Sequence, residues 1–143
     1  MESPLKVIAE EKDFHAFRAV LKSSDLPADD LNYQKDLLVG YVEDGALVGT
    51  GALEIYGAYG LLRSLSVKLG TRGKALGTAI TEYLIANAKE RGLRGIYLLT
   101  DKAQGFFQRK GFIEIPRDTV PQELHASSEF SHARVASAMH LPL

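Results

Sequence analysis

The chain has 143 residues, of which 45% are hydrophobic and 24% are charged, and its formal net charge is -1 at pH 7. This composition excludes an intrinsically disordered chain, and the balanced charge argues against a general affinity for nucleic acid. Since the sequence has no cysteine, disulfides, thiolate metal sites and an acyl-cysteine intermediate are excluded as well.

The length fits one domain, which we expect to span residues 1–143, because domains most often have about 100–150 residues. No apolar run approaches the roughly 18 residues that a membrane span needs, and the start from Met1 to Pro4 does not resemble a signal peptide. We therefore expect a cytoplasmic protein whose partner is a small molecule, with no nucleic acid and no membrane.

The first part of the chain predicts one helix and a set of antiparallel strands. A strand over Leu5–Ala9 precedes a helix with Asp13 as its expected N-cap, and a short helical turn is expected over Asp30–Lys35. Three strands follow at residues 37–42, 47–56 and 61–67, joined by turns at 43–46 and 57–60.

The segment after the third of these strands has the features of a phosphate-binding loop. Gly70, Gly73 and Gly77 leave room for close approach to the backbone, and Arg72 and Lys74 add positive charge. The loop opens an amphipathic helix, whose first turn has unpaired N–H groups that favour an anion. An ordinary solvated turn would also explain these residues, and neither common nucleotide-binding spacing fits.

The second part predicts a strand at 96–100, a short helix ending near Lys110, a strand at 112–115 and a last strand at 138–141. This order predicts a mixed sheet with helices on both faces. The four histidines, His15, His125, His132 and His140, lack the spacing of metal ligands, so we expect no metal site.

The segment from Leu61 to Phe112 resembles the acetyl-CoA-binding core of the GNAT superfamily of N-acetyltransferases. That core consists of a strand, the motif R/Q-x-x-G-x-G/A, a helix, a strand, a short helix and a Gly-Phe pair. Arg72 and Gly77 match the motif, whereas Ala75 stands where the family usually has glycine. The resemblance implies acetyl-CoA as cosubstrate and the α/β (α+β mixed) GNAT fold, in which a mostly antiparallel sheet of six to seven strands has a splayed central pair.

The resemblance also implies where the cofactor binds. The pantetheine arm would pair with the backbone of one strand, the pyrophosphate would lie against the loop, and the short helix would lie beside both. The implied residues are Leu65, Ser66 and Val67 for the arm, Arg72, Gly73, Lys74, Ala75, Leu76 and Gly77 for the pyrophosphate, and Phe106, Phe107 and Lys110 near the short helix.

Many members have a tyrosine in this short helix that protonates the departing thiolate. Phe106-Phe107 cannot do this, so the acid is a water, a hydroxyl such as that of Ser127 or Ser128, or none.

Two charged residues within apolar strands are candidates for the chemistry. Glu54, partly desolvated, would be a stronger base and could remove the proton of an ammonium, directly or through water, whereas a solvent-facing glutamate is the alternative. Tyr56 shares its face and could touch substrate. Arg63 needs an anionic partner, which is either a substrate carboxylate or Glu54, and the two arrangements can coexist.

The stretch from Pro116 to Phe130 is too polar to be core, and in the GNAT fold this region closes over the acceptor site. Arg117, Ser127, Ser128 and Glu129 are therefore candidate acceptor contacts, with a solvated surface loop as the alternative.

Over nearly the whole chain, segments such as Ala52–Gly57, Leu61–Leu65 and Ser128–Phe130 resemble the small GNAT proteins known as arsenic-resistance N-acetyltransferases. The resemblance implies direct acetylation of the amine of a small amino acid or amino-acid-like compound, an arsenic-linked toxin included. Without thiolates, direct capture of trivalent arsenic is excluded. The alternatives are a protein lysine or N-terminal acetyltransferase and a CoA-binding regulatory domain, and the protein is expected as a monomer or a homodimer.

Overall fold

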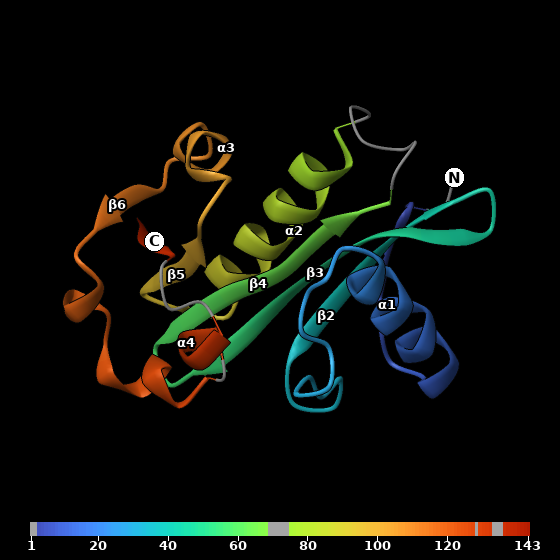
Figure 1. The fold of residues 1–143 in the computed structure, drawn as a ribbon, viewed down its shortest axis with the longest axis horizontal. Helices are drawn as coiled ribbons and strands as arrows, with labels where there is room; N and C mark the ends of the chain where they lie inside the picture. Colours follow the sequence, from blue (N-terminus) through green and yellow to red (C-terminus); the bar gives the residue numbers. More distant parts are fainter. Residues whose placement is uncertain (1–2, 69–74, 128, 133–135) are drawn as a thin grey trace.

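The computed structural model describes residues 3–68, 75–127, 129–132 and 136–143. The elements are β1 (Leu5–Val7), α1 (Glu11–Ser23), β2 (Leu37–Glu43), β3 (Ala46–Tyr56), β4 (Tyr59–Val67), α2 (Leu76–Glu90), β5 (Gly95–Thr100), α3 (Gln104–Gln108), β6 (Ile113–Ile115), the 3-10 helices η1 (Arg117–Thr119) and η2 (Gln122–Ala126), α4 (Glu129–His132) and β7 (Ser137–Pro142) (Figure 1). Within these ranges, no helix combines the length and apolarity needed to cross a bilayer.

The described strands form one sheet in the order β1-β2-β3-β4-β5-β7-β6. Every neighbouring pair is antiparallel except β4 and β5. These two pair only where Tyr59–Leu61 meets Gly95–Tyr97, although β4 continues to Val67 and β5 continues to Thr100. The expected mixed sheet and its splayed central pair are confirmed. Because the two strands diverge, the second half of β4 is not hydrogen-bonded to β5.

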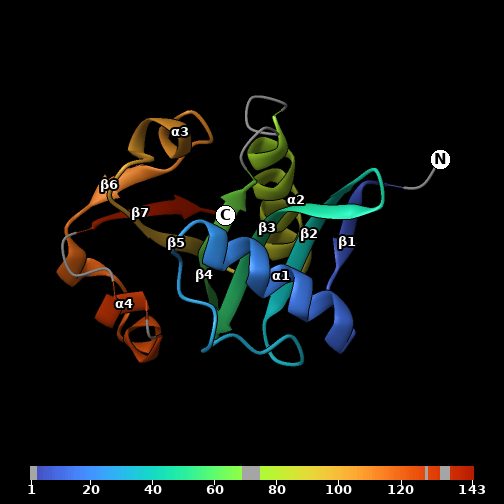
Figure 2. The same cartoon turned by 45° about the vertical axis from the view of Figure 1, so that its right-hand side comes forward.

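The two long helices lie on opposite faces of the sheet (Figures 1 and 2). Alternate residues of β2 and β3 account for this, because side chains along a strand point to opposite faces. Leu37 and Leu53 pack with Ile80 and Leu84 of α2, whereas Leu38 packs with the α1 side of the sheet. Residues on the same face of the sheet as Leu38, among them Glu54, therefore face α1 and the segment that follows it.

Three local expectations are wrong. Helix α1 begins at Glu11 with Glu10 as its extended N-cap, and Asp13 lies in the first turn, where its Oδ2 pairs with Nζ of Lys6 at 3.0 Å. The segment expected as a short helical turn, Asp30–Lys35, forms turns and no helix, and the N–H groups of Lys35 and Asp36 donate to the carbonyl of Asn32. The polar stretch before α4 does contribute core residues, since Val120 and Leu124 are buried against β4 and β5.

We predict that close packing between β3 and α2 makes Gly51→Ala destabilising. A Cβ at Gly51 would lie 2.4 Å from Cγ2 of Ile80 and 3.1 Å from Cδ1 of Leu84. Overpacking of this kind costs about 1–3 kcal/mol, which urea unfolding can measure. Gly105→Ala is the control, because its Cβ would meet only the flexible end of Arg109 at 3.6 Å. Equal free energies of unfolding for the two variants would contradict this packing.

Candidate active site

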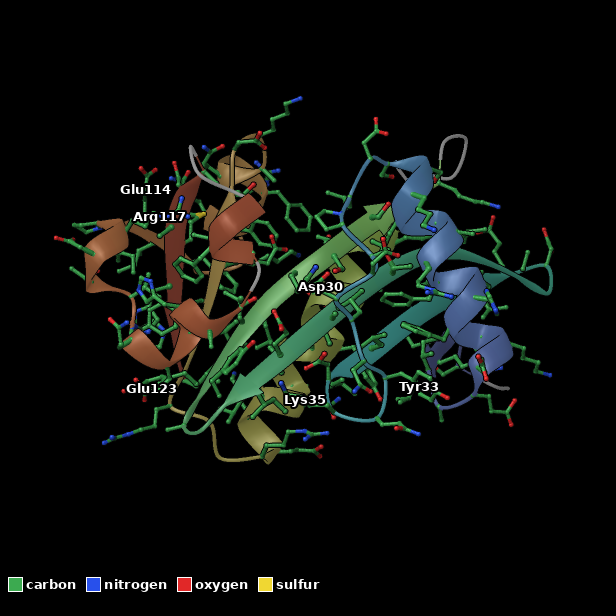
Figure 3. The ribbon with its side chains drawn as sticks, turned by 60° about the horizontal axis from the view of Figure 1, so that its bottom comes forward. Asp30, Tyr33, Lys35, Glu114, Arg117 and Glu123 are labelled. Carbon is green, nitrogen blue, oxygen red and sulfur yellow. The ribbon has the colours of Figure 1, made fainter. Side chains whose placement is uncertain are left out.

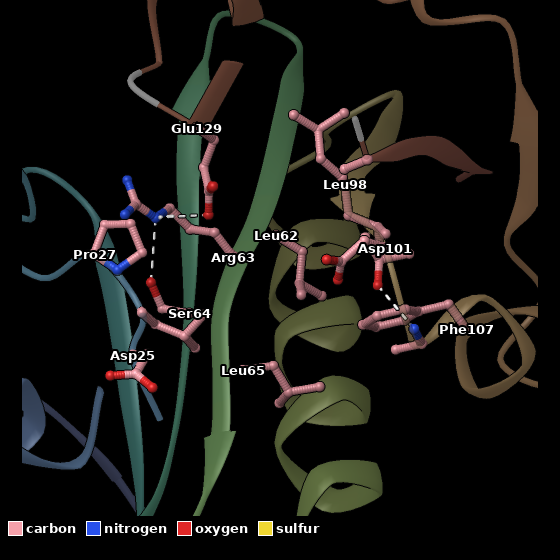
Figure 4. A pocket seen from close by; sticks show the side chains of 15 residues that line it. Asp25, Pro27, Leu62, Arg63, Ser64, Leu65, Leu98, Asp101, Phe107 and Glu129 are labelled. Carbon is pink, nitrogen blue, oxygen red and sulfur yellow. Dashed lines mark hydrogen bonds and ion pairs between the residues drawn. The ribbon is translucent and has the colours of Figure 1, made fainter. Parts of the chain in front are cut away.

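A cavity of about 530 Å³ lies where β4 and β5 diverge (Figure 4). One wall is the second half of β4, the opposite wall comes from β5 and α3, and the segment after α1 and the start of α4 complete it. The lining residues are Leu62, Arg63, Ser64 and Leu65 of β4, Leu98, Leu99 and Thr100 of β5, Asp101, Ala103 and Phe107 of the following turn and α3, Asp25, Leu26 and Pro27 after α1, and Glu129 and Ala136.

A β-bulge interrupts β4 at the wall of this cavity. Thr50 pairs with Ser66 and Ala52 pairs with Arg63, so two residues of β4 lie opposite one residue of β3. Ser64 takes a left-handed backbone conformation with φ 62°, and its carbonyl accepts a hydrogen bond of 2.8 Å from the buried hydroxyl of Thr50. Because the C=O and N–H of a trans peptide point in opposite directions, the N–H of Leu65 points away from β3, toward the cavity side.

Arg63 is held by carboxylates from three segments, and only 1% of its side chain is exposed. Its Nη1 and Nη2 bind the two carboxylate oxygens of Asp30, the second contact at 3.1 Å, in the bidentate geometry that suits a guanidinium. Its Nε lies 3.3 Å from Oε1 of Glu129, and its Nη1 lies 3.5 Å from Oε1 of Glu54 (Figure 4 shows the Glu129 contact). Burial lowers the pKa of Arg63, but the hydrogen bonds that Arg63 donates to Asp30 and the charges of the carboxylates outweigh it and raise the pKa.

Glu54 is buried behind Arg63, with 6% of the residue exposed, and therefore does not face solvent. Its Oε1 accepts a hydrogen bond of 2.6 Å from Oγ of Ser127, and its Oε2 accepts one of 2.8 Å from the hydroxyl of Tyr56. Burial, followed by the hydrogen bond to Glu54, raises the pKa of Tyr56 to about 12, so this phenol stays protonated near neutral pH. Neither Glu54 nor Tyr56 lines the cavity, so Glu54 can exchange a proton with an acceptor there only through an intervening group.

Some of the expected cofactor residues lie around the opening of β4. Leu65 and Phe107 line the cavity, and Oγ of Ser66 lies 2.6 Å from Oγ of Ser24 at the end of α1. A Cβ on Gly77 would lie 3.7 Å from Phe106, so the start of α2 and helix α3 are neighbours. Lys110 lies 5.7 Å above the ring of Phe106 and 3.4 Å from Glu82, outside the cavity lining.

Among the described residues, no side chain caps the start of α2. Ala75 is its N-cap and makes no side-chain capping hydrogen bond, and Leu76, in the first turn, is buried. Ala75 has φ 61°, a left-handed conformation that favours glycine and that gives a physical reason for the glycine expected there. The expected residues Arg72, Gly73, Lys74 and Ser128 lie outside the described residues, as do the first two loop glycines.

The segment before β7 contributes unequally to the site. Glu129 lines the cavity, whereas Ser127 does not; its Oγ accepts a hydrogen bond of 3.2 Å from the N–H of Glu129 and donates one to Glu54. Arg117 donates hydrogen bonds to the carbonyls of Phe130 at 3.0 Å and Ala136 at 3.4 Å, away from the cavity lining, and Figure 3 shows it on the far side of β4 from Asp30. In the described part of the chain, no cluster of His, Asp or Glu could hold a metal ion.

The sequence did not single out Asp30, Thr50 or Ser64. Asp30 lies in the segment between α1 and β2, where a carboxylate is usually solvated, and a serine carries no mark of a left-handed conformation. Only the position of Asp30 between two hydrophobic residues, Ala28 and Leu31, hinted that this segment packs against the sheet.

Comparison with known proteins identifies the family. The family model described as Acetyltransferase (GNAT) family matches residues 8–112. The chain is 33% identical over 81 residues to an amino-acid acetyltransferase of Mycobacterium tuberculosis, a match that covers 56% of this chain and 46% of that protein. The chain spans about half or less of the length of the curated relatives that it matches.

Solved structures share the fold at low sequence identity. The structure of Rv2747 from Mycobacterium tuberculosis in complex with CoA and NLQ has a TM-score of 0.78 and 23% identity, and the match covers 97% of this chain and 98% of that one. The N-acetylglutamate synthase from Neisseria gonorrhoeae, complexed with coenzyme A and N-acetyl-glutamate, has a TM-score of 0.81 and 17% identity over 100% of this chain and 36% of that one. These likenesses establish the fold.

We predict that the β4 bulge depends on the hydroxyl of Thr50. Thr50→Val keeps the shape but leaves the carbonyl of Ser64 without this donor, which should cost about 1–3 kcal/mol in the free energy of unfolding. Thr81→Val is the matched control, because the hydroxyl of Thr81 is equally buried but has no hydrogen-bond partner among the described atoms. Its stability should be unchanged or higher. A loss at position 81 that equals the loss at position 50 would show that the bulge does not rely on this hydrogen bond.

Proposed function

Because the chain belongs to the GNAT acetyltransferase family, we propose that it transfers the acetyl group of acetyl-CoA directly to the amine of a small amino acid or amino-acid-like compound. The observation that carries the proposal is the pair of opposite charges, Arg63 and Glu129, on the cavity wall. A guanidinium beside a carboxylate complements a zwitterion. The similarity to an amino-acid acetyltransferase supports this substrate class.

In this proposal Arg63 binds the carboxylate of the acceptor. Arg63 is the cationic side chain of the cavity lining in the described part of the chain. An incoming carboxylate competes with Glu129 for the guanidinium. The distance from Nε of Arg63 to Glu129, 3.3 Å, is longer than the distance from Nη2 to Asp30, 3.1 Å. Glu129 in turn attracts the ammonium of the acceptor. The ion pair of Arg63 with Glu54 coexists with this role, since it uses a different nitrogen.

The acetyl thioester would lie against the bulge. The N–H of Leu65 is directed to the cavity side and would donate to the thioester oxygen as negative charge develops there. The pantetheine arm would run along β4 toward the start of α2, whose first-turn N–H groups suit the pyrophosphate. The expected contacts of Phe106 and Phe107 fit this path, because both lie beside it.

Glu54 would accept the ammonium proton, through a bridging water or Oγ of Ser127 because it does not line the cavity. Phe107 occupies the position where many members have a tyrosine and cannot donate a proton. A thiol has a reference pKa of about 8.5, so the departing thiolate needs little assistance near neutral pH. In the same proposal, the hydroxyl of Ser128 is an alternative to water as the acid that protonates the departing thiolate.

Release of free thiol from acetyl-CoA tests the proposal. A disulfide dye reports the thiol without background, because the protein has no cysteine. The acceptor panel should hold free amino acids, phosphinic and arsenic-containing amino acid analogues, and lysine peptides. We expect turnover with a free amino acid or analogue, and a loss of about 100-fold or more in kcat for Glu54→Gln.

Activity with lysine peptides alone would transfer the assignment to protein acetylation. Binding of CoA without thiol release for any amine would instead indicate a regulatory domain. Unchanged kcat in Glu54→Gln would remove Glu54 as the proton acceptor.

A further inference from the structure

Helix α4 brings Glu129 to the cavity, although the helix has only 4 residues. Glu129 is its first residue, lines the cavity and pairs with Arg63. A helix of this length is not stable by itself, because its first turn fixes several backbone angles for a single hydrogen bond. Contacts with the rest of the molecule must therefore fix the position of Glu129.

The start of α4 is attached to the buried carboxylate of β3. Oγ of Ser127, a residue that is 3% exposed, donates a hydrogen bond of 2.6 Å to Glu54 and accepts one of 3.2 Å from the N–H of Glu129. The N–H of Phe130 donates to the carbonyl of Ser127 at 3.2 Å. These bonds act at the first residues of α4, and a second point of attachment is needed to fix the direction of the helix.

Arg117 supplies a second attachment. Its Nη2 donates a hydrogen bond of 3.0 Å to the carbonyl of Phe130, and its Nη1 donates one of 3.4 Å to the carbonyl of Ala136, just before β7. The guanidinium also lies 5.3 Å from the centre of the Phe130 ring, within the range of a cation–π interaction. The ring of His125 contacts the same Phe130 ring, with centroids 4.4 Å apart. Both the backbone and the side chain of Phe130 are therefore held from outside α4.

Arg117 itself lies on a part of the chain that is anchored in the core. It begins η1 directly after Pro116, at the end of β6, which pairs with β7. The N–H of Val120 donates to the carbonyl of Arg117 at 3.3 Å, and Val120 and Leu124 are buried against β4 and β5. In Figure 1 the chain runs from β6 along the left edge of the molecule and returns as α4. From this base, a planar guanidinium with several fixed donors can bind two carbonyls at once.

We propose that Arg117 is a positioning residue for acceptor binding: it holds the backbone of α4 and thereby keeps the carboxylate of Glu129 on the cavity wall. The proposal rests on the role proposed above for Glu129, which is to attract the acceptor ammonium. It replaces the direct contact with the acceptor that the sequence suggested for Arg117, since Arg117 does not line the cavity. Binding of the acceptor then depends on a side chain that the acceptor does not touch.

Hydrogen exchange tests the attachment without any assay of activity. In Arg117→Ala, the peptides that contain Phe130 should exchange their backbone amides about tenfold faster or more than in the wild type, because α4 opens locally. Peptides from β4 should keep the wild-type rates. Arg94→Ala is the matched control, because Arg94 is exposed and precedes the start of β5, at the end of that strand away from the cavity. It removes the same charge and should leave both sets of rates unchanged.

Steady-state kinetics with an acceptor from the panel tests the effect on binding. Arg117→Ala should raise the KM of the acceptor about fivefold or more and change the KM of acetyl-CoA less than about twofold. Arg117→Lys should have a smaller effect, because lysine keeps the charge but does not bind two carbonyls in the geometry of a guanidinium. In a Glu129→Gln background, Arg117→Ala should raise the KM of the acceptor less than about twofold further, because it acts through the Glu129 carboxylate.

Wild-type exchange rates in Arg117→Ala would overturn the proposal. A rise in the KM of the acceptor that is equally large in the Glu129→Gln background, or that the KM of acetyl-CoA matches, would show a purely structural role and would overturn it as well. If Arg117→Ala does not fold, Arg117→Lys takes its place in each test, with smaller effects of the same sign. Absence of turnover with every amine would contradict the proposed function instead, and hydrogen exchange would still decide whether Arg117 holds α4.

Discussion

The guanidinium of Arg63 is buried and is held by carboxylates from three segments that are far apart in the sequence. Asp30 follows α1, Glu54 belongs to β3, and Glu129 begins α4. Removing one member of a buried ion cluster leaves uncompensated charge and typically costs about 3–5 kcal/mol. The relative positions of the sheet, the segment after α1 and the segment before β7 therefore depend on this one side chain. These segments line the end of the cavity at which we propose that the acceptor binds.

Backbone geometry determines the other end of the site. The parallel pairing of β4 with β5 ends at Leu61, and the bulge at Ser64 redirects the backbone just beyond this point. The hydroxyl of Thr50 holds the Ser64 carbonyl on the β3 side, which directs the next N–H to the cavity side. In the proposed reaction few side chains are then needed, because a backbone N–H of β4 would bind the thioester oxygen and those at the start of α2 would bind the pyrophosphate.

The sequence predicted the elements whose periodicity is clear and the charged residues that interrupt it. Glu54 and Arg63 stood out because they lie in apolar strands, and the structure buries both in one cluster. Asp30 could not be recognised, since an acidic residue between two secondary-structure elements looks the same in the sequence whether it is solvated or buried. The bulge at Ser64 was equally hidden, because it arises from the register of two strands and leaves no mark in the sequence.

The comparison of an amino acid acceptor with its amide, in the wild type and in Arg63→Lys, tests most directly whether Arg63 binds the acceptor carboxylate. Lysine keeps the positive charge within the cluster but cannot bind a carboxylate in the bidentate geometry of a guanidinium. The account predicts that kcat/KM for the amino acid falls about tenfold or more, while kcat/KM for the amide and the KM for acetyl-CoA change little. An equal fall for the amino acid and its amide would show that Arg63 only holds the walls of the cavity together.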